Sequence, residues 1–236
     1  MAEHTVKQYD EELDGIRTRV LQMGGYVEQQ VVQAMEGLFD GDLRTVEHII
    51  ENDHKVNEQQ VELDEACTQI IARRQPAAND LRTIMSVSRI VTDLERIGDE
   101  AKKIAKAARS LLQNENSGPP RVQMRHLGRL AVEQLRKSLD ALARLDLDSA
   151  AEVVKDDHDL DTEFKAVMRQ LITFMMEDPR TISRGIDVLF AAKALERIGD
   201  HAKNIAEHTI FLVHGRDVRY IGVTEVLKEV GYRPPN

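Results

Sequence analysis

The chain has 236 residues, a formal net charge of −9 and no tryptophan, and 31% of its residues are charged. That length supports one large or two small domains, each with a buried core. The acidic balance argues against nucleic acid as a partner, because such binding relies on basic groups that neutralise phosphates. Abundant charge with few aromatic residues favours long helices over sheets.

Neither a secretory signal nor a membrane span can be recognised in the sequence. Residues 1–10 contain no apolar core of a signal peptide, and no apolar run approaches the roughly 20 residues that cross a bilayer. Cys67 is the single cysteine and falls at an apolar position of a helical pattern, which is typical of a small core residue. These features predict a protein of the reducing cytoplasm, without direct membrane insertion.

Turn-forming residues divide the chain into six helical segments of roughly 25 to 35 residues. The break at 117–120 is the richest in glycine and proline, with three segments on each side. Short connections make neighbouring helices antiparallel. The prediction is an all-α protein of two tandem, sequence-related antiparallel three-helix bundles. They occupy 1–116 and 121–215, joined by a linker at 117–120 and followed by a C-terminal tail at 216–236, which we expect to hold at most a short helix.

A twelve-residue sequence that occurs twice is the strongest signal in the chain. LERIGDEAKKIA at 94–105 returns as LERIGDHAKNIA at 195–206, at an offset of 101 and with two positions changed. Packing alone would keep the apolar positions alike and let the others vary. A further match, at an offset of 104, relates Asp42 to Asp146, each placed to cap the second helix of its half. The duplication therefore concerns surface chemistry as well as fold.

Acidic residues lie four apart in each copy of this motif, on the side of the helix opposite its apolar seam. Glu95 and Asp99 form the first pair and Glu196 and Asp200 the second, and all are predicted to point to solvent. Like charges at this spacing repel weakly. A cation would reverse the effect, because carboxylate oxygens suit hard divalent metals and ferric iron. The alternative is an ordinary ion pair between each Asp and the lysine three residues later. The doubling favours a metal or ligand site.

A glycine interrupts each motif, at Gly98 and at Gly199. Glycine inside a helix costs about 1 kcal/mol relative to alanine. Either close helix packing or room for a ligand or partner would account for it. Together with the neighbouring Arg96 and Arg197, the two glycines are candidate partner-binding residues.

The second helix of each half places an acid in its apolar register. Asp157 falls within the seam predicted from 153 to 174, and Asp53 occupies the equivalent place in the first half. A carboxylate turned into a core needs a strong partner. A buried pair with Arg96 or Arg197 and a metal site shared with Asp161 both remain open. Helix angles place these acids and the third-helix acids on different faces, and do not settle whether they converge.

Other acidic and histidine patterns are weaker. Glu51-x-x-His54 matches the Glu-x-x-His of di-iron carboxylate bundles, but the second half has Lys155 in place of the glutamate. His201 and His208, two turns apart on one helix, are weaker candidate metal ligands.

No phosphate-binding glycine loop, nucleophile elbow or zinc-finger spacing is present in the sequence. Nothing in it resembles the active site of an enzyme. Asp10 and Asp14 share the acidic spacing but have no counterpart in the second half, and we interpret them as a solvated face.

The doubled Glu-Arg-Ile-Gly-Asp-x-Ala-Lys-x-Ile-Ala resembles the PhoU family, the phosphate-specific transport system accessory proteins. Residues 9–13 and 20–24 are similar to that family's first helix, and 215–219 to its closing segment. The resemblance implies a cytoplasmic, non-enzymatic regulator, often a homodimer. Such a protein links the ATP-binding subunit of the high-affinity phosphate transporter to the phosphate-sensing histidine kinase. It restrains phosphate uptake and expression of the phosphate-starvation genes.

The resemblance also implies metal binding through the acidic pairs, with iron, manganese, magnesium or zinc as candidate ions. Asn57 departs from the acidic pattern in the first half. A ferritin-like carboxylate-metal protein or oxidoreductase and a purely structural helical scaffold are the alternatives. The candidate metal ligands are Glu95, Asp99, Glu196, Asp200, Asp157, Asp161 and Asp53.

Overall fold

The computed structural model describes residues 2–113 and 124–232, and within these ranges all regular structure is helical. The predicted all-α class is therefore confirmed, while the predicted linker at 117–120 lies outside the described residues. The first half consists of α1 (Ala2–Asp40), α2 (Leu43–Asn52), α3 (His54–Arg74) and α4 (Ala78–Gln113). The second half consists of α5 (Met124–Arg144), α6 (Leu147–Glu177), a 3-10 turn (Pro179–Thr181), α7 (Ile182–His214) and α8 (Val223–Val230).

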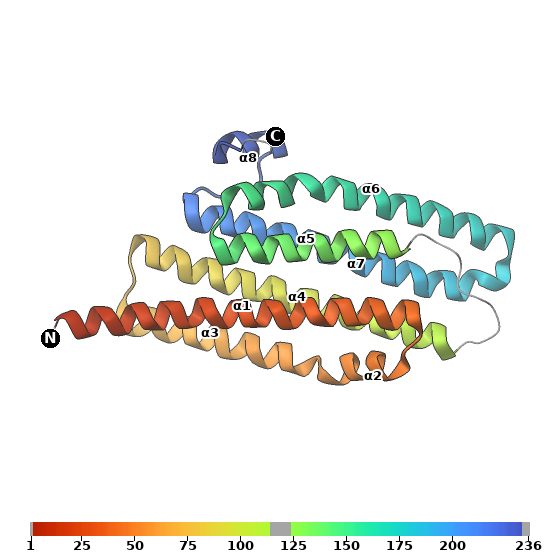
Figure 1. Cartoon of the computed structure of the whole chain (residues 1–236), viewed down its shortest axis with the longest axis horizontal. Helices are drawn as coiled ribbons and strands as arrows, with labels where there is room; N and C mark the ends of the chain where they lie inside the picture. The colour runs from red at the N-terminus through yellow and green to blue at the C-terminus, as the bar shows by residue number, and fades with distance from the viewer. Residues whose placement is uncertain (1, 114–123, 233–236) are drawn as a thin grey trace.

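The two halves lie side by side along their length, with α4 and α7 packed against each other in opposite directions (Figure 1). In α4, every seam residue is fully buried. The hydrophobic core continues without interruption from these residues into Leu195 and Ile198 of α7. The two bundles therefore form one body around a common core. The buried α4 seam consists of Ile90, Leu94, Ile97, Ala101 and Ile104.

The second helical segment of the first half is divided into two helices, where the prediction had one. α2 ends at Asn52 and α3 begins at His54, whereas the equivalent α6 is continuous over 31 residues. The Asn52 side chain donates a hydrogen bond to the backbone oxygen of His48 (2.8 Å). The Nδ1 atom of His54 lies 2.8 Å from the backbone oxygen of Glu51. Such side-chain contacts compete with the helical hydrogen-bond ladder. The break falls at Asp53, one of the candidate site residues.

Both predicted N-caps are confirmed, and their geometry is the same in the two halves. Asp42 Oδ1 accepts hydrogen bonds from the backbone N–H groups of Arg44 (3.0 Å) and Thr45 (3.4 Å). Asp146 Oδ1 accepts hydrogen bonds from the backbone N–H groups of Asp148 (3.0 Å) and Ser149 (3.2 Å). The caps satisfy N–H groups that the first turn leaves unpaired, so they set where the second helix of each half begins.

The buried seam of α6 ends before its last turn, and the C-terminal tail packs on the second half. The α6 seam is buried as far as Leu171, but Phe174 is 37% exposed, so the seam ends sooner than predicted. The expected short C-terminal helix is α8. It docks on the second half through buried Val226, and the Tyr232 hydroxyl donates to Glu152 on α6 (3.0 Å). Among the described helices, none is long and apolar enough to cross a membrane.

Candidate functional site

The acids of the doubled motif lie where the third helix of each half meets the second. Glu95 and Asp99 on α4 are half-buried, as is Glu196 on α7, whereas Asp200 is exposed. The expectation that all four point to solvent is therefore correct only for Asp200. The other three are partly shielded from solvent.

Asp200 is surrounded by carboxylates from two helices. Protein packed around its carboxyl group and the charges of Glu196 and Asp157, with a smaller contribution from Asp161, raise its pKa to about 6. In the first half, burial and the charges of Asp99 and, more weakly, Asp53 raise the pKa of Glu95. The acids of the second and third helices thus lie near enough in each half to influence one another electrostatically.

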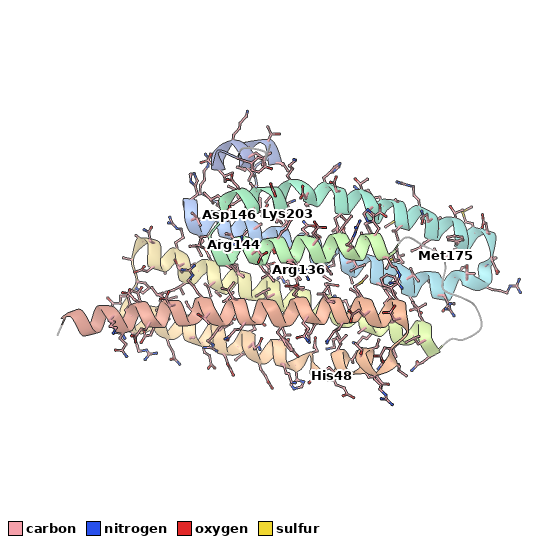
Figure 2. The ribbon with its side chains drawn as sticks, viewed as in Figure 1. His48, Arg136, Arg144, Asp146, Met175 and Lys203 are labelled. Atoms are coloured by element: carbon pink, nitrogen blue, oxygen red, sulfur yellow. The ribbon has the colours of Figure 1, made fainter. Side chains whose placement is uncertain are left out.

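Each acid in the core register is neutralised by a lysine of the third helix. Asp53, which is 5% exposed, accepts a hydrogen bond from Lys102 Nζ at 2.6 Å. Asp157, which is 9% exposed, accepts from Lys203 Nζ at 2.9 Å; Lys203 is labelled in Figure 2. The repeated lysines therefore cross to the second helix. They do not form the alternative surface pairs with Asp99 and Asp200. The partner of each core acid is a lysine, not the arginine that the sequence analysis left open.

The contact with Asp157 favours the charged form of Lys203. Burial of the Lys203 ammonium opposes its charge, but the hydrogen bond to Asp157 and the charges of Asp157 and Glu207 raise its pKa. Asp157 also accepts from the amide of Gln134 on α5 at 3.2 Å. All three helices of the second bundle therefore converge on this carboxylate.

The side chain of Arg197 reaches from the second half to the first. Its guanidinium lies 3.0 Å from a carboxylate oxygen of Glu100 on α4, and Lys103 reaches the same oxygen at 2.9 Å. The side chain of Glu100 is only 3% exposed, so both cations cover it from outside. Arg96, the equivalent residue of α4, is exposed.

A second buried charge cluster joins the halves, and sequence reasoning missed it. Asp93 on α4 lies 2.9 Å from His201 Nδ1 and 3.5 Å from His208 Nε2, and accepts from Asn204 at 3.0 Å. Burial opposes ionisation of Asp93, but the hydrogen bonds from these three residues outweigh it and lower its pKa to about 2.

A signal for this interface was present in the repeat. The two positions at which the copies differ are Glu100 against His201 and Lys103 against Asn204. All four residues belong to the two clusters between α4 and α7. The histidines are thereby tied to Asp93, rather than arranged as the metal ligands considered above.

Close helix packing explains the two motif glycines. Both are buried, and an added Cβ would meet Val56 at 3.2 Å from Gly98 and Leu160 at 2.3 Å from Gly199. The expectation that they contact a partner is corrected, since the second helix of each half already covers them. Arg96 and Arg197 keep exposed side-chain surface and stay candidates.

The remaining candidates lie outside these clusters. Glu51 and His54 are exposed, as are Asp10 and Asp14. Burial raises the pKa of the Cys67 thiol to about 11, which keeps it protonated and unreactive.

The acidic sites fit a cation in chemistry and only partly in geometry. Their oxygen donors suit hard metals. The raised pKa of Asp200 is caused first by the protein packed around it and then by the charges of Glu196 and Asp157. Glu196 is itself ion-paired with Lys193. Within 2–113 and 124–232, however, no three His, Cys, Asp or Glu side chains are arranged to hold a metal ion. The described side chains thus offer carboxylate pairs rather than an assembled ligand set.

Fold and site together define an all-helical protein of two related bundles, each carrying an acidic pair on its third helix. The family model described as "PhoU domain" matches both bundles, at residues 20–108 and 124–209. The chain therefore belongs to the PhoU family.

Curated relatives and solved structures agree with this assignment. The phosphate-specific transport system accessory protein PhoU homolog of Pseudomonas aeruginosa is 46% identical over 230 residues, covering 98% of this chain and 95% of the relative. PhoU of Escherichia coli is 42% identical, with coverage of 95% and 93%. The crystal structure of PhoU from Pseudomonas aeruginosa superposes with a TM-score of 0.85, covering 88% of this chain and all of that one. That of the phosphate transport system regulatory protein PhoU from Streptococcus pneumoniae gives 0.81 at 29% identity, covering 89% and 99%.

Proposed function

We propose that this protein is a cytoplasmic adaptor that negatively regulates phosphate uptake and phosphate-starvation gene expression. It links the ATP-binding subunit of the high-affinity phosphate transporter to the phosphate-sensing histidine kinase. The observation that carries the proposal is the similarity over nearly the whole chain to proteins named as accessory to phosphate-specific transport. Those names describe an accessory role, which is consistent with a protein that is not an enzyme.

Gene deletion tests the regulatory part of the proposal. Expression of phosphate-starvation genes is measured at high phosphate in the wild type, the deletion strain and complemented strains. We expect high expression in the deletion and silencing by the wild-type gene. Low expression in the deletion strain would contradict the proposal. Crosslinking followed by pull-down should recover the kinase or the transporter subunit, and recovery of neither would count against the linking role.

We further propose that the acidic pairs bind metal ions that are structural or that recruit a partner. Glu95 with Asp99, and Glu196 with Asp200, would hold the ion and supply a positive charge at the surface. Asp53, Asp157 and Asp161 lie close enough to influence it electrostatically. The charges of Glu196 and Asp157, which add to desolvation in raising the pKa of Asp200, support this, because a bound cation would offset their repulsion.

Metal content tests this second proposal. The purified protein is dialysed separately against Mn²⁺, Mg²⁺, Zn²⁺ and anaerobic Fe²⁺, and its metal is then measured by mass spectrometry. Replacing Glu196 with Gln and Asp200 with Asn should remove about half of the bound metal. Replacement of Asp10 and Asp14 by Asn is the matched control, since that pair is exposed at the same spacing. Equal metal content in both variants would exclude the site.

The homodimer that the family resemblance implies also stays a proposal. Light scattering coupled to gel filtration distinguishes it directly, because the chain has a mass of 26.7 kDa. A mass twice this value is expected, and a mass equal to it would contradict the dimer.

The ferritin-like alternative has its own test. An anaerobic ferrous-loading assay without oxygen consumption would exclude that alternative.

A further inference from the structure

A groove of about 460 Å³ lies between α4 and α7. Lys193 on its α7 wall is ion-paired with Glu196 of the second acidic pair. Lys103 and Lys106 of α4 form one wall, and Phe190, Lys193 and Arg197 of α7 form the other. The groove therefore combines an aromatic side chain with four cations, and both halves of the molecule contribute to it.

The charge that this groove presents to solvent is positive. Its carboxylates are Glu100 and Asp187. Glu100 is 3% exposed beneath Lys103 and Arg197, whose side chains are 52% and 46% exposed. Lys193, whose side chain is 50% exposed, likewise covers Glu196, which is 12% exposed. Four cations therefore face three carboxylates, two of which are covered, and the surface is basic on a chain whose net charge is −9. The local charge is thus opposite in sign to that of the whole molecule.

An exposed apolar stripe on α7 leads into the groove. Ile182, Ile186 and Phe190 follow one another at intervals of four residues and are 42%, 41% and 63% exposed. Lys193 and Arg197 continue the same helix face at intervals of three and four. The stripe starts at the end of the molecule where the α6–α7 connection lies, near the Met175 label in Figure 2. One face of α7 is therefore apolar at its start and basic where the groove begins.

We propose that this surface, the α7 stripe with the adjoining groove, binds an acidic amphipathic helix of a partner protein. Helices dock into grooves through apolar side chains at intervals of three and four residues. The exposed spacing on α7 matches that periodicity. Acidic residues flanking such a stripe would meet the lysines and arginine of the groove, which favours specificity and rapid association.

Charge makes other occupants less favourable. In a symmetric dimer, the same surface of two copies would meet, so the cations of one groove would face those of the other. An anionic membrane would be repelled by the net charge of the chain, and its flat surface does not fill a groove. The inference rests on the proposed adaptor function and adds the chemistry of one partner and the place where it binds.

A display library of 18-residue helical peptides with random charges tests the proposal, with the folded full-length chain as target. We expect enrichment of peptides with excess Asp and Glu and with apolar residues every three or four positions. Phe190→Ala and Lys106→Glu should each raise the Kd of a selected, fluorescently labelled peptide at least tenfold. Higher salt should also weaken binding, because the charges are exposed.

Matched controls exclude trivial causes. Tyr220→Ala removes another exposed aromatic ring, and Arg129→Glu reverses another exposed charge, both away from the groove. These variants should bind the peptide like the wild type, and all four should keep a wild-type melting temperature. Phosphatidylglycerol vesicles are sedimented with the same proteins, and no co-sedimentation is expected.

Three results would overturn the inference. They are the absence of any enriched acidic peptide, peptide binding that Phe190→Ala and Lys106→Glu leave unchanged, and vesicle binding that Phe190→Ala abolishes. If one of these results is found while the wild-type gene still represses expression in the deletion strain, the groove is not the binding site, and the proposed adaptor function is unaffected. A deletion without effect on gene expression would instead remove the adaptor function.

Discussion

At the scale of single residues, the carboxylates of each half fall into two electrostatic classes. Asp53 and Asp157 lie in the core register and each accepts a short hydrogen bond from a lysine ammonium. Glu95 and Asp200 have raised pKa values, because the protein packed around them and neighbouring acids disfavour their charge. The first class holds helices together, and the second is left with negative charge that a ligand could neutralise.

Asp200→Asn should stabilise the protein at neutral pH. The folded-state pKa of about 6 exceeds the ordinary value of about 3.9, so stability is lost as the pH rises from about 4 through about 6. Removing the charge should add about 1 kcal/mol at pH 7.5 without divalent cations, a value kept small because Asp200 is exposed to screening solvent. Urea unfolding should show this gain at pH 7.5 and little of it at pH 4. A gain of equal size at both pH values, or one shared by the exposed Asp10→Asn, would contradict the argument.

Lys203→Met should destabilise the second half, because it leaves Asp157 buried without its cation. Removing one partner of a buried pair is more damaging than replacing both. Since the lysine is 32% exposed, we expect a loss of about 2 kcal/mol in urea unfolding. The double variant Lys203→Met with Asp157→Leu should recover part of this loss. Lys106→Met, on the exposed side of α4, is the control and should change stability by less than about 0.5 kcal/mol.

At the scale of helices, close approach explains the glycines in the motif. The second helix of each half lies directly over the third, with Val56 of α3 above Gly98 and Leu160 of α6 above Gly199. That approach brings the lysine of one helix within reach of the core acid of the next. Helix packing and the acidic site therefore depend on the same two positions.

Gly199→Ala should destabilise the protein by about 1–2 kcal/mol, as overpacking does in a filled core. Its Cβ would lie 2.3 Å from Leu160 and 3.1 Å from the Gln134 side chain. Gly25→Ala in α1 is the control, because nothing lies within 4 Å of the added atom. That substitution should stabilise by about 0.5–1 kcal/mol through helix propensity alone. Thermal unfolding of both variants decides the matter, and a stabilised Gly199→Ala would contradict the packing argument.

At the scale of the molecule, α4 and α7 join the two halves through buried apolar and charged groups. The hydrophobic core crosses from one half to the other. Asp93 with its two histidines forms one polar contact, and Glu100 with Arg197 forms another. A shared core predicts that the halves unfold together rather than one after the other.

Asp93→Asn should destabilise the whole molecule by about 2–3 kcal/mol, because it removes the charge that His201 and His208 face in a buried site. Urea unfolding followed by circular dichroism should show a single transition in both proteins, shifted to lower urea in the variant. Asp140→Asn, an exposed acid on α5, should leave the midpoint unchanged. Two separate transitions in the wild type would contradict the shared core.

The sequence by itself determined the helical class, the division into related halves, both N-caps and the inward acids at 53 and 157. These features follow from local periodicity and from side chains that act on their own backbone. The tertiary structure decided which lysine pairs with each core acid. It also decided that Arg197 pairs with Glu100 and that Asp93 contacts His201 and His208 of the second half. Those contacts join residues 46 to 115 positions apart, and helical spacing carries no information on which helix faces another. The two substitutions within the repeat lie at the contact between halves, because there each copy faces the other copy instead of its own bundle.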